Sequence, residues 1–179
     1  MKKFLIIGNI NAITYKEIFP LIKGNKMWIG IPFAAGNAYF YVENVKAYAT
    51  GVYDETKGLV KFRNCHWFTN LDHDKRHEKI DLYKHYTQEE YPKYDNYDAI
   101  NVDKTCEIPM DYDGGVMGVP ITFLDKYCPE QFEIIGLMSG VKHDVFINGD
   151  DGRAKFYING KGVYARILIR IKNKTIMKL

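Results

Sequence analysis

The order of apolar and polar positions in the first 30 residues predicts a strand, a helix and a second strand. Residues 4–7 (FLII) are uniformly apolar, which is typical of a short strand covered on both faces. Thr14 and Glu17 have the spacing of a capping box, in which each side chain satisfies a free amide at the start of a helix. Residues 27–29 (MWI) then begin a second buried strand. The pattern therefore predicts an α/β unit.

Two residues shape the expected helix, and two others mark a ligand site. Pro20 lies at about the fifth helical position, where its missing amide predicts a short or bent helix. Gly24 is placed for a left-handed C-terminal cap. Asn9 and Asn11 follow the first strand, and open α/β sheets bind ligands beyond the carboxyl ends of their strands. We therefore expect the edge of a ligand site at residues 8–11.

Downstream, the pattern indicates mainly antiparallel strands separated by turns. Strands are predicted at residues 38–42, 45–52, 59–70, 99–102 and 132–138. Residues 155–158 and 163–171 flank the sequence Asn159-Gly160-Lys161-Gly162, and Asn-Gly is a strong local signal for a β-hairpin. We expect these two segments to pair with each other.

Residues 71–97 differ in character because they are crowded with charge and contain few aliphatic residues. They predict an exposed loop with a short helical turn near 88–90, where Thr87 and Glu90 repeat the capping-box spacing. A second short helix is predicted at residues 120–127, which begin with proline.

Composition places the chain among ordinary globular proteins. Its 179 residues are 46% hydrophobic and 26% charged, which allows a substantial core. The formal net charge of +3 is too small to diagnose nucleic-acid binding by itself. Three widely spaced cysteines argue against a disulfide framework and favour a reducing cytoplasm. The first apolar run is too short for a signal peptide, and no run approaches the roughly 20 residues of a membrane span.

Several catalytic and metal-binding patterns are weak or missing. His73 and His77 have the spacing of a helical metal site, but their charged segment is a poor helix former, so a solvated loop is the better interpretation. Cys65 and His66 are neighbours on a predicted strand and point to opposite faces, which disfavours a thiol–imidazole dyad. The sequence has no P-loop and no GxGxxG fingerprint. Ser139 lacks a nucleophile elbow.

The segment most informative about function is aromatic and basic. Residues 63–70 (RNCHWFTN) bring stacking groups and hydrogen-bonding side chains into one strand end. Basic residues between Lys75 and Arg170 can line a face that follows phosphates. Because 22 acidic residues dilute 25 basic ones, composition alone leaves open whether these aromatic residues bind nucleic acid or fill the core.

Four segments carry a resemblance to a known family. They are FLIIGNINAITYKEIFPLIKGNKMWIG, FRNCHWFTNLDHDKRHE, EEYPKYDNYDAINV and DYDGGVMGVPITFLDKYCPEQFEIIG. In this order, and over nearly the whole chain, the sequence resembles the EcoRI-type adenine-specific DNA methyltransferases. The resemblance implies methyl transfer from S-adenosylmethionine to the exocyclic N6 of adenine in double-stranded DNA. The flipped base would be held by stacking and by hydrogen bonds.

The sequence departs from the family pattern in one respect that matters for activity. Such enzymes have an Asn-Pro-Pro-Phe motif that orients the target amine, and an upstream glycine-containing turn for the cofactor. Neither occurs here, and no two of the six prolines are adjacent. The resemblance therefore implies the C-terminal portion of a restriction–modification enzyme, inactive alone. It also implies that S-adenosylmethionine is bound by the full-length enzyme rather than by this chain.

The resemblance also refines the expected fold, which is α/β. Residues 1–70 are expected to form the C-terminal half of a Rossmann-like methyltransferase sheet, and residues 71–179 a mainly antiparallel α+β target-recognition region. Residues 4–7 would then be the strand after the missing catalytic strand. An open edge beside that strand favours pairing with a second copy of the chain.

Substrate-binding residues are expected at Asn9, Asn11, Asn64, Trp67, Phe68 and Arg166. Trp67 and Phe68 lie in the run that resembles the strand lining the base pocket, so both are candidates for packing against an extruded adenine. Packing inside a hairpin core explains each of them equally well. No catalytic or metal-binding residue is assigned. Two alternatives stay open: a non-catalytic DNA- or protein-binding module derived from the family, and an unrelated small α/β protein.

Overall fold

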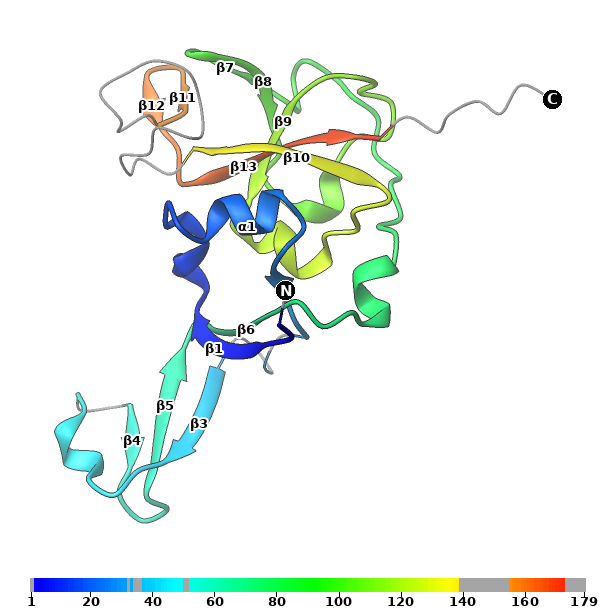
Figure 1. The fold of residues 1–179 in the computed structure, drawn as a ribbon. Coiled ribbons are helices and arrows are strands. Elements are labelled where there is room, and N and C mark those ends of the chain that lie inside the picture. Colours follow the sequence, from blue (N-terminus) through cyan, green and yellow to red (C-terminus); the bar gives the residue numbers. More distant parts are fainter. Residues whose placement is uncertain (1, 32, 34–36, 50–51, 139–154, 173–179) are drawn as a thin grey trace.

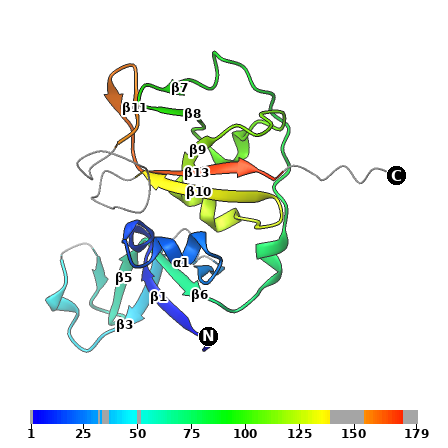
Figure 2. The same cartoon turned by 45° about the horizontal axis from the view of Figure 1, so that its top comes forward.

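The structure is a computed structural model that describes residues 2–31, 33, 37–49, 52–138 and 155–172. It is a sheet-rich α/β fold with short helices, as the sequence predicts in outline (Figure 1). A three-stranded and a five-stranded sheet form the body, with the helix α1 between them in both views (Figures 1 and 2). Within these residues, no helix is long and apolar enough to cross a membrane.

The three-stranded sheet contains both strands predicted in the first 30 residues. Strand β6 (Cys65–Thr69) lies between β1 (Leu5–Asn9) and β2 (Trp28–Ile29) and is antiparallel to both. Strands β1 and β2 are therefore parallel to each other but not hydrogen bonded. The expectation that β1 is covered on both faces is wrong for the described residues, because Leu5 and Ile6 are 53% and 52% exposed. Nothing in the described part of the chain pairs with its outer edge.

The connection from β1 to β2 is helical, but the predicted capping box does not form. A 3-10 helix, η1 (Ile10–Thr14), is followed by α1 (Phe19–Lys23). Pro20 lies in the first turn of α1, where a missing amide costs nothing, so the helix begins after Thr14 and Glu17 rather than at them. Gly24 has an ordinary φ of −81°, and the left-handed residue is Asn25, with a φ of 51°.

A second three-stranded sheet extends from the body as a ribbon. It consists of β3 (Asn37–Tyr41), β5 (Leu59–Arg63) and β4 (Tyr53–Asp54), in that order and antiparallel. The strand predicted at 45–52 is wrong, because a 3-10 helix, η3 (Val45–Ala47), begins there and bonds its backbone locally. The strand region predicted at 59–70 is divided into two strands, β5 and β6. The break is at Asn64, whose left-handed φ of 57° bends the chain.

The five-stranded sheet contains most of the later strands in the order β10-β13-β9-β8-β7. Their bounds are β7 (Lys93–Tyr94), β8 (Tyr97–Asn101), β9 (Met117–Pro120), β10 (Phe132–Met138) and β13 (Arg166–Ile171). Strands β8 and β9 are parallel and the other pairs are antiparallel. The predicted strands at 99–102 and 132–138 are thus confirmed within a few residues.

The Asn-Gly hairpin forms, but it is shorter than predicted. Strands β11 (Tyr157–Ile158) and β12 (Lys161–Gly162) pair across Asn159 and Gly160, whose φ angles are 50° and 72°. This is the two-residue turn that Asn-Gly favours. The expected pairing of 155–158 with 163–171 holds only at Val163, whose amide donates to the Phe156 carbonyl at 2.9 Å. For residues 166–171 it is wrong, because β13 pairs with β10 and β9 instead.

The remaining helices are short and lie in connections. They are η4 (Asp74–His77), η5 (Thr105–Glu107) and η6 (Ile121–Lys126). The turn predicted near 88–90 is present, and the amide of Glu90 donates to the Thr87 hydroxyl oxygen at 3.2 Å. Helix η6 begins directly after Pro120, as expected.

One hydrophobic core joins the two regions that the resemblance separates at residue 70. Phe19, Ile22 and Phe68 from the first region belong to the same cluster of buried side chains as Phe132 and Ile169 from the second. The three cysteines are free; Cys65 and Cys128 are buried and Cys106 is exposed. Ser139 lies outside the described residues.

Candidate functional site

Strand β6 presents two different faces. Successive side chains of a strand point in opposite directions, so Phe68 faces away from its neighbour Trp67. Phe68 is 4% exposed and packs in the main core with the helical segment. Trp67 lies on the other face, where its ring stacks on Phe33 with 5.2 Å between ring centroids. The structure therefore does not bring the two predicted base-packing residues to one surface.

The face that carries Trp67 is open and mostly apolar. A cleft of about 390 Å³ is lined by Leu5, Gly30, Ile31, Trp67, Thr69, Leu71, Asp72 and His73. The amide of Gly30 donates to the Trp67 carbonyl at 2.8 Å, and this close approach positions β2 beside the tryptophan. A flat aromatic ligand can enter such a cleft and find stacking area on its wall.

A second open cleft lies farther along β1 and β6, towards the ribbon. Its volume is about 370 Å³, and it is lined by Ile7, Gly8, Asn9, Phe40, Val42, Phe62, Arg63 and Cys65. Asn9 and Arg63 are its polar side chains. They stand at the carboxyl end of β1, where the sequence predicts the edge of a ligand site.

Three predicted asparagines are brought together at this end of the sheet. The Asn9 side-chain oxygen accepts the Asn11 amide at 2.9 Å and so caps η1. The Asn64 carbonyl accepts the Ile10 amide at 2.8 Å, which joins the β5–β6 bend to the end of β1. All three residues are exposed. Asn9 lines the second cleft, and the exposed residues Asn11 and Asn64 are joined to this end of β1 through their backbone groups.

Arg166 lies elsewhere, in the five-stranded sheet, and its side chain is only 13% exposed. Its Nε donates to the Asn101 side-chain oxygen at 3.0 Å, and an Nη nitrogen is 3.6 Å from the Asp103 carboxylate. The Tyr94 hydroxyl donates to the same Asn101 oxygen at 2.8 Å, and burial raises the pKa of Tyr94. Arg166 is therefore held in a buried polar network and does not share a surface with Trp67.

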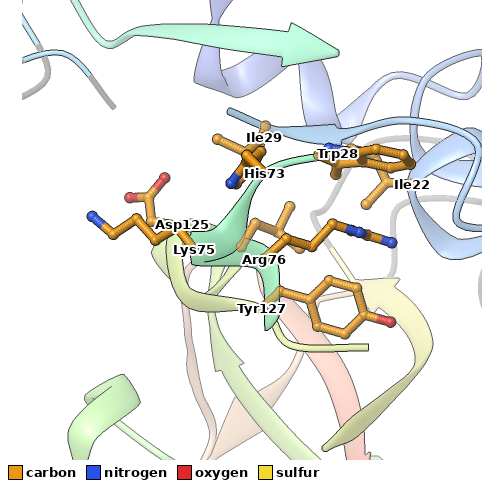
Figure 3. A pocket seen from close by; sticks show the side chains of 9 residues that line it. Ile22, Trp28, Ile29, His73, Lys75, Arg76, Asp125 and Tyr127 are labelled. Carbon is orange, nitrogen blue, oxygen red and sulfur yellow. The ribbon is translucent and has the colours of Figure 1, made fainter. Parts of the chain in front are cut away.

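Below β2, a small enclosed space contains polar groups that the sequence pattern does not reveal. Its volume is about 10 Å³, and Figure 3 shows His73 and Asp125 on its wall beside Arg76. Both ring nitrogens of His73 are buried without a hydrogen-bond partner. Asp125 lies 3.3 Å from Nε2 of the buried His66, an ion-pair distance without hydrogen-bond alignment. The carboxylate of Asp125 raises the pKa of His66, against the opposing effect of burial.

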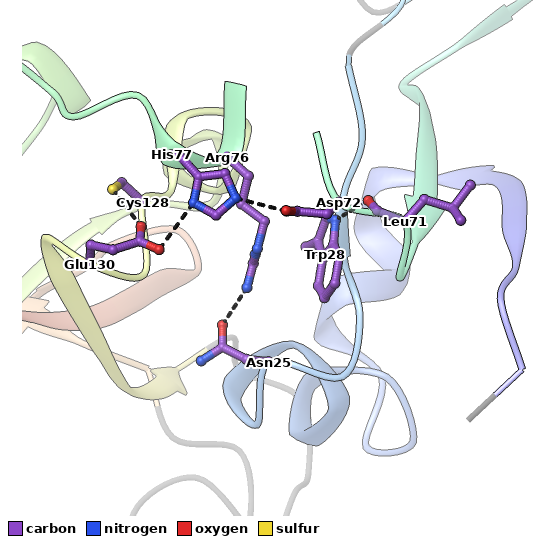
Figure 4. A network of polar contacts seen from close by, with 8 residues as sticks. All are labelled: Asn25, Trp28, Leu71, Asp72, Arg76, His77, Cys128 and Glu130. Carbon is purple, nitrogen blue, oxygen red and sulfur yellow. Dashed lines mark hydrogen bonds and ion pairs between the residues drawn. The ribbon is translucent and has the colours of Figure 1, made fainter. Parts of the chain in front are cut away.

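The charged segment after β6 is anchored rather than loose. The Arg76 guanidinium lies 4.0 Å from the centre of the Trp28 ring and donates to the Asn25 side-chain oxygen at 2.9 Å (Figure 4). His77 lies between Asp72 and Glu130, at 2.8 Å and 3.0 Å. Hydrogen bonding to Asp72 is the larger cause that raises the pKa of His77. The segment therefore fixes the three-stranded sheet to the turn before β10.

This arrangement corrects the interpretation of residues 71–78 as a solvated loop. Arg76 is buried at 8% exposure, and no local sequence signal indicates its partner Trp28. Across the residues that the structure describes, no group of three or more metal-ligating side chains occurs, and His77 instead contacts Asp72 and Glu130. What the open face offers is stacking area at Trp67 and hydrogen-bonding amides at the end of β1.

Comparison with known proteins gives the family. Residues 1–172 match the family described as "Adenine-specific methyltransferase EcoRI". The Type II methyltransferase M.EcoRI of Escherichia coli is 49% identical over 182 residues, which cover 99% of this chain and 52% of that protein. The Type II methyltransferases M.MgeORF184P of Mycoplasma genitalium and M.MpnI of Mycoplasma pneumoniae are 34% and 31% identical. They are matched over 94% and 98% of this chain, and over 57% and 58% of their own lengths.

The chain spans about half the length of the curated relatives that it matches. No solved structure gives a significant match. The match to this family covers all but the last residues of the chain, and this extent assigns the chain to the family. The chain belongs to the EcoRI family of adenine-specific methyltransferases.

Proposed function

We propose that the chain forms the C-terminal portion of an adenine-N6 DNA methyltransferase of a restriction–modification system, and that double-stranded DNA is its partner. The observation that carries this proposal is the family match over residues 1–172, with relatives named Type II methyltransferases. The open face of the three-stranded sheet supports it. Chemistry on a base requires that the base leave the duplex and enter a pocket between aromatic or apolar side chains.

In this proposal, Trp67 supplies the stacking wall for the extruded adenine. Its ring lies on the open face, is pre-positioned by Phe33, and borders a cleft large enough for a nucleobase. The amides of Asn11 and Asn64 are exposed beside the neighbouring cleft and can hydrogen bond to the nucleotide. Phe68 and Arg166 have structural roles in the described fold, so we do not assign them to the base.

S-adenosylmethionine supplies the methyl group in this reaction class. The described residues do not fit a complete site for it. Asp72, the one carboxylate that lines either of the two clefts, is already hydrogen bonded to His77. We therefore assign no residue to the cofactor. We propose instead that β1, whose outer edge is open, continues a Rossmann-like sheet supplied by the preceding part of the enzyme.

The proposal includes inactivity of these 179 residues by themselves, because the sequence contains no Asn-Pro-Pro-Phe motif to orient the target amine. The test is transfer of a labelled methyl group to duplex DNA by this chain and by the same chain joined to its upstream coding sequence. Transfer by the longer protein alone is the expected result. Transfer by the 179-residue chain at the rate of the longer protein would refute the proposal.

The role of Trp67 has its own test in DNA binding by the longer protein. Base–aromatic stacking contributes about 1–3 kcal/mol per base, so Trp67→Ala should weaken binding to a duplex with an unpaired target adenine. Tyr164→Ala, which removes a 91% exposed aromatic ring from another part of the surface, is the matched control. Equal affinities of the two variants would exclude Trp67 as the stacking wall.

A second candidate function is a non-catalytic binding module, and the exposed edge of β1 favours it. Leu5, Ile6 and Ile7 are 53%, 52% and 39% exposed on an unpaired strand, which can add a strand from a partner or from a second copy. Sedimentation of the chain and of Ile6→Lys distinguishes the cases. A stable dimer that the lysine abolishes supports assembly through this edge, whereas a monomer that lacks DNA affinity argues for a protein partner.

A further inference from the structure

The ribbon formed by β3 and β5 has two chemically different faces. Phe40 and Phe62 meet edge to face at 5.6 Å on the inner side, and Val60 is 1% exposed there. Tyr48 from the connection after β3 packs on the same Phe62 ring. The ribbon therefore has its own small core, on the face opposite to Tyr39 and Lys61.

The outer face combines exposed tyrosines with basic side chains. Tyr39 and Tyr41 are 60% and 82% exposed on β3. Tyr39 lies directly opposite Lys61 on β5, and the Lys61 Nζ is 5.9 Å from the centre of the tyrosine ring. Arg63 follows Lys61 on the same face, two residues along the strand, and is exposed. Residues two apart on a strand are about 7 Å apart, so these cations span about two phosphates of one DNA strand.

The charged side chains of β3 and β5 are Lys61 and Arg63, and both are basic. The adjoining strand β4 adds Asp54, but its carboxylate already accepts hydrogen bonds from Thr56 and lies 3.6 Å from Lys57. Arg63 also lines the cleft that contains Asn9, at the end of the sheet where the proposed base site begins. The ribbon thus extends from the proposed site into open space, as Figure 1 shows.

We propose that the outer face of the β3–β5 ribbon is an arm that binds the sugar–phosphate backbone of duplex DNA beside the target adenine. Lys61 and Arg63 contact phosphates, and the hydroxyls of Tyr39 and Tyr41 donate hydrogen bonds to phosphate oxygens. Contacts of this kind fix register without reading sequence. This inference rests on the proposed function, because that function names duplex DNA as the partner.

The test is the salt dependence of duplex DNA binding by the full 179-residue chain. Removal of two phosphate contacts in Lys61→Gln/Arg63→Gln should reduce the slope of log affinity against log salt by about 1.8. The affinity advantage of the unaltered chain over this variant should then shrink about twelvefold between roughly 50 and 200 mM salt. Lys16→Gln/Lys26→Gln removes the same charge from exposed positions on the helical segment and should leave the slope within about 0.5 of its original value.

The tyrosines are tested with Tyr39→Phe/Tyr41→Phe, which keeps the rings and removes the donors. This variant should bind duplex DNA about fivefold more weakly at low salt, while Tyr164→Phe should bind normally. If the ribbon variants and their controls bind DNA with equal affinities and equal salt slopes, the ribbon is not a DNA-binding arm. That result would leave the proposed function standing. Absence of DNA binding by the unaltered chain would overturn the arm, whereas the proposed function is refuted only by its own test of methyl transfer. Thermal unfolding of each variant confirms that it is folded.

Discussion

Gly30 is a position where the fold leaves no room for a side chain. A Cβ atom there would lie 2.9 Å from the Trp67 Cβ, closer than two such atoms pack. Gly30→Ala should therefore push β2 away from β6 and lower the free energy of unfolding by about 1–3 kcal/mol, as overpacking does. Urea unfolding measures this. Gly162→Ala is the control, because its new Cβ would meet nothing nearer than 3.6 Å. Equal losses in both variants would contradict the close approach of β2.

His66 should make the stability of the fold depend on pH. Asp125 raises the pKa of His66 above its usual value of 6.5. Because His66 binds a proton more tightly in the folded state, its protonation stabilises the fold. This stabilisation is complete below about pH 6.5, the pKa of the unfolded chain, and is lost as the pH rises through the pKa of His66 in the folded state. Asp125→Asn should therefore cost about 1 kcal/mol near pH 5.5 and clearly less near pH 8.5.

Urea titrations at the two pH values check this expectation. Glu55→Gln, which breaks an exposed ion pair with Lys46, provides the matched control and should show little effect at either pH. A cost for Asp125→Asn that is the same at both pH values would rule out the ion pair as its source.

At the scale of elements, the bend between β5 and β6 depends on one backbone conformation. Asn64 has a φ of 57°, and its carbonyl binds the amide of Ile10. A β-branched residue is strained in this left-handed region, so Asn64→Val should destabilise the fold by about 1–2 kcal/mol. Asn64→Gly should be tolerated, because glycine adopts this conformation freely. Thermal unfolding gives the ranking, and a valine variant as stable as the glycine variant would show that the bend is not required.

Elements that depend on nearby residues are predictable from the sequence. The apolar runs at 38–42, 99–102 and 132–138 form strands, and Asn159-Gly160 forms its turn, because short-range backbone preferences decide them. The pairing of 163–171 is different. Strand β13 pairs with the buried strands β10 and β9 and not with the segment that precedes it along the chain. No local sequence pattern indicates this pairing.

In the candidate site, too, the features set by nearby residues are predictable and those set by distant residues are not. Alternation along β6 predicts that Trp67 and Phe68 face opposite ways, but the helical segment that covers Phe68 decides which of them is buried. The position of Asn9 at the end of β1 is predictable from strand direction alone. The anchoring of Arg76 by Asn25 is not, since these residues are 51 positions apart and the segment around Arg76 has the composition of a solvated loop.

For the whole molecule, the shared core predicts a single unfolding transition. Ile169 of the five-stranded sheet and Phe68 of the three-stranded sheet belong to one buried cluster. Ile169→Ala should cost about 2–5 kcal/mol and lower the midpoint seen by the fluorescence of Trp28 and Trp67, which lie in the other sheet. Fluorescence and far-ultraviolet circular dichroism should give coincident transitions. Two separate midpoints would mean that residues 1–70 and 71–179 unfold as independent domains.

The place of β13 in its sheet has a consequence for biosynthesis. Strand β13 is the last described strand along the chain, but in the sheet it lies between β10 and β9. Among the described strands, β10 is hydrogen bonded to β13 alone. The ribosome makes the chain from its N-terminus at about 5–20 residues per second. Strand β13 is therefore synthesised after β7, β8, β9 and β10. Until residues 166–171 emerge, β10 presents an apolar run with unpaired backbone groups, a state exposed to aggregation. The five-stranded sheet therefore closes only once residues 166–171 have emerged, and β10 is exposed to aggregation until then.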